Sequence, residues 1–157
     1  MKQVVALVLL LFCLPLALRA QEDVPLIRKS FIVITATRSY SEALKNAKSA
    51  VAKLGYPLDL RGLHPNKQIG LTLTRADADS NGWEYPVNYP RGRYDDGKYI
   101  SIEYSSGYDG WKPNRYLVMV WSGNALDPER KKILNDVKKI FTSVELRSAN
   151  IYIGCMH

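Results

Sequence analysis

The stretch F-I-V-I-T-A-T-R-S-Y-S-E-A, residues 31–43, places a strand signal directly before a helix signal. Its first six residues are a short apolar run rich in β-branched side chains, which is typical of a buried strand. Ser39 and Glu42 then stand three residues apart, a spacing that can satisfy two unpaired backbone N–H groups at a helix start. The stretch therefore predicts a strand that leads into a capped helix.

Beyond Glu42, small and apolar residues recur at three- and four-residue steps, as on the buried face of a helix. These residues are Ala43, Leu44, Ala47, Val51 and Leu54. Gly55 suits a left-handed helix end. Residues 56–63, which include Pro57, predict a second strand.

A similar unit recurs near the C-terminus. Residues 116–121 predict an apolar strand, and Asp127 and Pro128 predict a helix start. A helical stripe follows, and residues 144–146 and 150–154 supply the closing strand. Two strand–helix–strand units predict an α+β fold of ferredoxin-like βαββαβ type, with two helices on one face of a mostly antiparallel sheet.

Between the two units, residues 66–115 predict an insertion whose hairpin extends the sheet. Two further strand candidates lie in it, residues 69–74 and 98–104, among stretches rich in Gly, Pro, Asn, Asp and Tyr. Seven of the ten tyrosines and two of the three tryptophans lie between Trp83 and Tyr116. This Tyr-rich insertion is where we expect function to reside.

Residues 32–43 resemble the opening strand and helix start of SPOR domains, the peptidoglycan-binding family, and residues 116–123 with the helix from Pro128 resemble its second repeat. Together they cover about half of the chain left after a signal peptide is removed. The resemblance implies a ferredoxin-like fold without catalytic residues. It also implies that glycan binds across the sheet face opposite the helices.

Sugar rings have apolar faces and polar rims, so their sites combine aromatic platforms with hydrogen-bonding or charged side chains. The insertion supplies this mixture on predicted loops, where binding residues are disproportionately found. The candidate ligand-binding residues are Trp83, Tyr85, Tyr89, Arg91, Arg93, Tyr94, Tyr108 and Trp111. The same residues would also serve to pack a long insertion onto the sheet.

Asp77, Asp79 and Asn81, followed by Gly82, match the first half of a calcium loop, in which alternate oxygens converge. At the twelfth position the match fails, because Asn88 stands where a bidentate Glu is needed. A polar turn between two strands accounts for the same residues. Calcium is the one cofactor that the sequence brings into consideration.

Catalytic patterns are sparse. Cys155 and His157 could face the same side of a strand, but a third group is needed to complete a nucleophilic or metal site. Asp95, Asp96 and Glu103 lie near one hairpin and leave open a carboxylate-dependent glycan hydrolase. We expect no enzymatic activity.

Residues 1–20 have the pattern of a secretory signal peptide: Lys2, an apolar run too short for a confident membrane span, and Ala20 before polar residues. Its removal lowers the formal net charge from +7 to +5 and takes away Cys13. The remaining residues 21–157 predict a single domain in the periplasm or outside the cell. We expect no membrane span after cleavage and no nucleic-acid partner.

The sequence therefore predicts a secreted or periplasmic, non-catalytic domain that binds a cell-envelope glycan, with peptidoglycan favoured. The first alternative is a secreted protein-interaction module, such as an inhibitor of a wall-degrading enzyme. Its interface would be the same Tyr-rich insertion. The second alternative is the carboxylate-dependent hydrolase.

Overall fold

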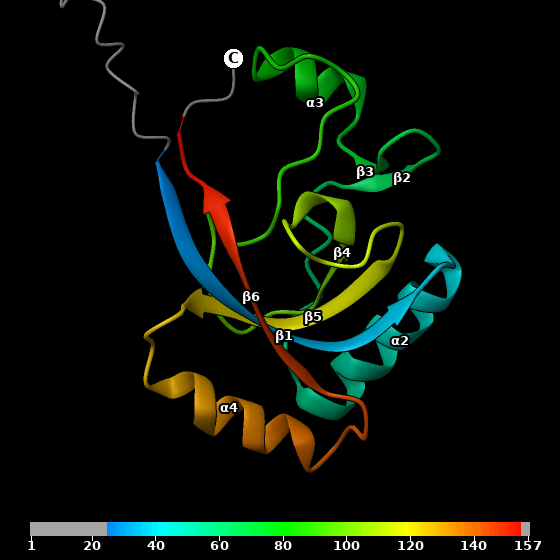
Figure 1. The fold of residues 1–157 in the computed structure, drawn as a ribbon. Coiled ribbons are helices and arrows are strands. Elements are labelled where there is room, and N and C mark those ends of the chain that lie inside the picture. The colour runs from blue at the N-terminus through cyan, green and yellow to red at the C-terminus, as the bar shows by residue number, and fades with distance from the viewer. Residues whose placement is uncertain (1–24, 155–157) are drawn as a thin grey trace, which may run out of the picture.

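The computed structural model describes residues 25–154. Four strands form one antiparallel sheet in the order β4-β5-β1-β6, and β2 and β3 form a separate hairpin. The elements in chain order are β1 (Leu26–Thr37), α2 (Tyr40–Leu54), β2 (His64–Asn66), β3 (Gly70–Thr72), α3 (Arg75–Ser80), β4 (Ser101–Tyr104), the 3-10 turn η2 (Ser105–Gly107), β5 (Tyr116–Asn124), α4 (Glu129–Lys138) and β6 (Glu145–Tyr152). The α+β class with an antiparallel sheet is confirmed, and the arrangement is compatible with a ferredoxin-like fold (Figure 1).

The central strand is the one that the opening stretch predicts. β1 pairs with β5 on one side and with β6 on the other. Phe31 to Ile34 are all buried. Because side chains alternate along a strand, Ile32 and Ile34 pack on the helix side while Phe31 and Val33 pack on the opposite side.

Helices α2 and α4 cover one face of the sheet (Figure 1). Both helices contribute the predicted apolar face to the hydrophobic core. The alanines of α2 and the Ile133–Val137 pair of α4 are buried there together with side chains of β1 and β5. Ser39 accepts from the Glu42 N–H and Gly55 ends α2 at φ 69°, as predicted. Just before α4, the Asp127 carboxylate accepts a hydrogen bond from the Glu129 N–H at 2.8 Å.

The capping box at α2 is only half formed. The Glu42 carboxylate accepts from the Thr37 hydroxyl instead of reaching back to the Ser39 N–H. That N–H donates to Thr37 Oγ1 at 3.2 Å. Thr37 therefore takes the role that the spacing alone assigned to Glu42.

The prediction of a strand over residues 56–63 is wrong. This segment makes one isolated bridge, between Leu58 and Ile100. Pro57 cannot donate to a ladder, and Arg61 and Gly62 turn the chain with φ values of 54° and 67°. The strand that completes the sheet is β4, inside the region predicted as an insertion.

Residues 69–74 do form a strand, but a short one. β3 pairs only with β2, which the sequence did not predict, and the hairpin lies next to β4 (Figure 1). Residues 75–80 form helix α3 instead of a polar turn, with Thr74 as its N-cap. Successive helical residues are rotated by about 100°, so Asp77 and Asp79 point in different directions and do not converge as in a calcium loop.

The predicted signal peptide, Cys155 and His157 lie outside the described residues. Across residues 25–154, none of the helices combines the length and apolar character that crossing a membrane requires.

Candidate functional site

The sheet face opposite the helices is buried, although the family resemblance implied an exposed binding face there. Phe31, Leu117 and Met119 on this face are fully buried. The segment after Tyr104 folds back over it, so that Tyr108 stacks on Trp111 with ring centroids 4.6 Å apart and both rings meet the Phe31 ring edge-on. The insertion therefore covers the sheet face on which the resemblance places a glycan.

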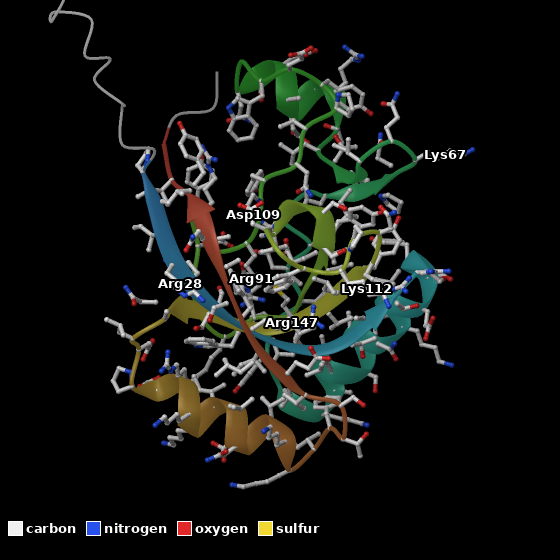
Figure 2. All side chains as sticks on the ribbon, viewed as in Figure 1. Arg28, Lys67, Arg91, Asp109, Lys112 and Arg147 are labelled. Carbon is white, nitrogen blue, oxygen red and sulfur yellow. The ribbon has the colours of Figure 1, made fainter. Side chains whose placement is uncertain are left out.

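Arg91 is the clearest case of a predicted ligand-binding residue that serves the core. Its side chain lies among the strands (Figure 2) and is 0% exposed. Five acceptors receive its guanidinium hydrogens: the carbonyl oxygens of Gly97, Tyr99 and Met119 and the hydroxyls of Ser101 and Ser122. The guanidinium also lies 3.5 Å from the Tyr99 ring centroid. Burial lowers the pKa of the Arg91 guanidinium, and the ring of acceptors is what makes its burial tolerable.

A second buried cation lies beside the first. Arg61 forms an ion pair with Glu103, with side chains 3% and 1% exposed, and its guanidinium also stacks on Tyr89 at 4.8 Å. Burial lowers the pKa of the Arg61 guanidinium, but the combined effect of Glu103 and the nearby Tyr108, Tyr99 and Asp95 raises it overall. Tyr108 donates to Glu103 at 3.1 Å, and burial raises the pKa of the Tyr108 phenol.

These contacts separate the three carboxylates of the hydrolase alternative. Glu103 is sealed inside the core with Arg61. Asp95 accepts from the Tyr99 hydroxyl, and Asp96 pairs with Lys29. Each carboxylate has its own partner, and Glu103 has no access to a substrate in this conformation.

The remaining predicted aromatic residues lie in separate places. Trp83, Tyr89 and Tyr94 form an edge-to-face chain with neighbouring centroids 5.8 and 5.7 Å apart. Tyr94 is 59% exposed, and Arg93 lies over its ring. Elsewhere, Tyr85 is covered by Arg75, and the half-buried Trp111 by Arg147. The eight predicted residues therefore do not form one site.

A groove that sequence reasoning missed lies between the β2–β3 hairpin and the chain on either side of β4 and β5. One part, here called the amide end, has a volume of ≈ 460 Å³. Its lining carries no charged side chain; it consists of Gln68, Ile69, Pro86, Val87, Asn88, Pro90, Tyr104, Ser106, Gly107 and Asn114. Asn88 Oδ1 is buried without a hydrogen-bond partner among the described residues, so a ligand hydroxyl could satisfy it.

The adjoining part, the basic end, has a volume of ≈ 560 Å³. It shares Tyr104 and Asn114 with the amide end, which makes the two parts neighbours. The rest of its lining is Arg38, Asn66, Lys67, Lys112, Pro113, Arg115 and Tyr116. Four cations and no carboxylate line it, so the basic end is suited to a negatively charged group.

Tyr104 is the shared wall, and its position is fixed by close packing. Gly70 has a φ of 81°, and a Cβ there would lie 2.2 Å from the Tyr104 ring. The ring also packs on Tyr116 at 5.1 Å, and Tyr104 donates to Asn114 Oδ1 at 3.3 Å. Burial raises the pKa of the Tyr116 phenol. The groove therefore has a preformed aromatic wall.

Comparison of the chain with protein-family models, with curated proteins and with solved structures gives no match in any of the three.

Proposed function

We propose that this protein is an exported, non-catalytic domain that binds a cell-envelope glycan, with peptidoglycan as the favoured polymer. The observation that carries the proposal is the amide end of the groove, which three amide side chains line together with Tyr104. Amides donate to and accept from sugar hydroxyls and acetamido groups, and a tyrosine ring packs on the apolar face of a sugar. A volume of ≈ 460 Å³ is in the range of small-molecule sites.

The proposed site differs from the sheet face implied by the resemblance to SPOR domains. We propose a ferredoxin-like βαββαβ core in which the insertion precedes β4. The order β4-β5-β1-β6, with α2 after the first core strand and α4 after the third, supports this core. A SPOR relationship would then require that binding has moved from the sheet face to the groove.

The test uses the exposed amides Gln68 and Asn114. Asn114 has a φ of 59°, so it is replaced by Gly, which adopts this conformation without strain. Binding of wild type and of the Gln68→Ala/Asn114→Gly variant to purified sacculi is measured by sedimentation, and to N-acetylglucosamine oligomers by calorimetry. A matched control, Asn135→Ala/Asn150→Ala, removes two exposed amides outside the groove. We expect the groove variant alone to bind about tenfold more weakly, a loss of about 1.4 kcal/mol. The proposal would be overturned if wild type bound neither the sacculi nor the N-acetylglucosamine oligomers.

A second candidate, a secreted protein-interaction module, is favoured by a different surface. Leu26 and Tyr94 are 51% and 59% exposed, and Arg93 lies over the rings of both Tyr94 and Tyr152, the residue paired with Leu26. Apolar side chains gathered in this way are typical of protein interfaces. Inhibition of a purified muramidase by wild type, lost in Tyr94→Ala, would support this candidate over the first.

A further inference from the structure

The basic end of the groove has a property that the amide end lacks, namely positive charge without partners. Across residues 25–154, none of the side chains of Arg38, Lys67, Lys112 and Arg115 forms a salt bridge or a hydrogen bond. Some other cations of the described residues do have partners: Lys29 pairs with Asp96 and Arg147 with Glu145. The four groove cations are therefore free to bind an external anion.

Three separate segments bring these cations together. Arg38 lies in the connection from β1 to α2, Lys67 in the turn between β2 and β3, and Lys112 and Arg115 in the connection from η2 to β5. In Figure 2, Lys67 and Lys112 lie on the same side of the molecule. The planar guanidinium groups of the two arginines can form paired hydrogen bonds with carboxylate or phosphate oxygens, and the flexible ammonium groups of the two lysines can bind the same oxygens.

The two ends of the groove share Tyr104 and Asn114, so they lie next to each other. We propose that the ligand is an acidic glycan: an uncharged sugar binds at the amide end beside Tyr104, and a carboxylate or phosphate on the same chain binds at the basic end. This inference rests on the proposed function and names the class of glycan that it selects. Of the neighbouring carboxylates, Asp109 lines a shallow depression with Lys112 and Arg147, outside the groove itself.

The experiment compares one glycan with and without its charge. Glycan strands freed of stem peptides by an amidase carry free carboxylates, and reduction of these groups to alcohols gives an uncharged strand of the same length. Wall polymer with phosphodiester groups forms a third arm that distinguishes phosphate from carboxylate as the anion. Wild type, Lys67→Gln/Lys112→Gln and the control Lys131→Gln/Lys132→Gln, which removes the same charge from the exposed surface of α4, are titrated with each at two salt concentrations.

We expect wild type to bind the carboxylate or the phosphate strand about tenfold more tightly than the reduced strand at low salt, a preference weakened by screening at high salt. The Lys67→Gln/Lys112→Gln variant should lose this preference and bind the reduced strand as wild type does, while the control keeps it. Equal binding of charged and reduced strands by wild type, or an equal loss in the control, would overturn the inference and leave the proposed function standing. Binding of none of the strands would overturn both.

Discussion

Two clusters of cations in this protein differ in burial and in hydrogen bonding. Arg61 and Arg91 are buried between the sheet and the insertion, and their charges are matched by Glu103 and by a ring of carbonyl and hydroxyl oxygens. Arg38 and Lys67, in the groove, have no partner among the described residues. The first cluster therefore contributes to the fold, and the second is available to a ligand.

Arg91→Leu and Arg38→Leu test this difference most strongly. Arg91→Leu removes the guanidinium donor from the Tyr99 and Met119 carbonyls and from two buried hydroxyls, and we expect it to lower the free energy of unfolding by about 3 to 5 kcal/mol. Arg38→Leu should change it by less than about 0.5 kcal/mol, as is usual at exposed positions. Urea unfolding of both variants provides the measurement, and similar losses in the two would contradict the distinction.

Gly70→Ala tests whether the groove wall depends on close packing. The new Cβ must displace the Tyr104 ring and adopt a positive φ, for which we expect a loss of about 1 to 3 kcal/mol together with weaker glycan binding. Gly82→Ala is the control, since Gly82 has a φ of 69° but no atom near its missing Cβ. If both variants bind glycan equally well, Tyr104 does not form the wall.

The buried cluster also predicts how stability responds to alkali. Burial raises the pKa of the Tyr99 phenol, as it does for Tyr108. The unfolded chain ionises near pH 10 while the folded chain keeps these protons, so stability is intact below pH 10 and falls above it. Each such tyrosine contributes up to about 1.4 kcal/mol per pH unit. Tyr99→Phe should reduce the slope of unfolding free energy between pH 10 and 11, and an unchanged slope would contradict the assignment.

Local patterns predicted the elements that are regular and strongly periodic. β1, α2, β5 and α4 were all expected near their observed positions, because apolar spacing and capping residues act within a few neighbours. The prediction of a strand over residues 56–63 was wrong because its apolar residues pack without a β-ladder. β4 was expected in a hairpin that extends the sheet, whereas it is one of the four strands of the sheet itself. Pairing between distant strands is not encoded in the spacing of one segment.

The candidate site was harder to predict from the sequence. Arg91 looked like a surface residue because arginine is seldom buried. Its acceptors are also distant in the sequence; one of them is the Ser122 hydroxyl. The groove residues Gln68, Asn88 and Asn114 stand in three separate loops, and only the folded chain brings them to Tyr104. The one available signal was the Tyr- and Asn-rich composition of the insertion, which indicated the region but not which of its residues face a ligand.

The most direct test of the account is to map glycan binding onto the chain by nuclear magnetic resonance. A ¹⁵N-labelled protein is titrated with an N-acetylglucosamine oligomer, and side-chain as well as backbone amide shifts are followed. We predict that the side-chain amides of Gln68, Asn88 and Asn114 shift, while the backbone amides of Met119 and Ala149 on the covered sheet face do not. Shifts confined to the sheet face or to Trp83 and Tyr94, or no shifts at all, would contradict the account.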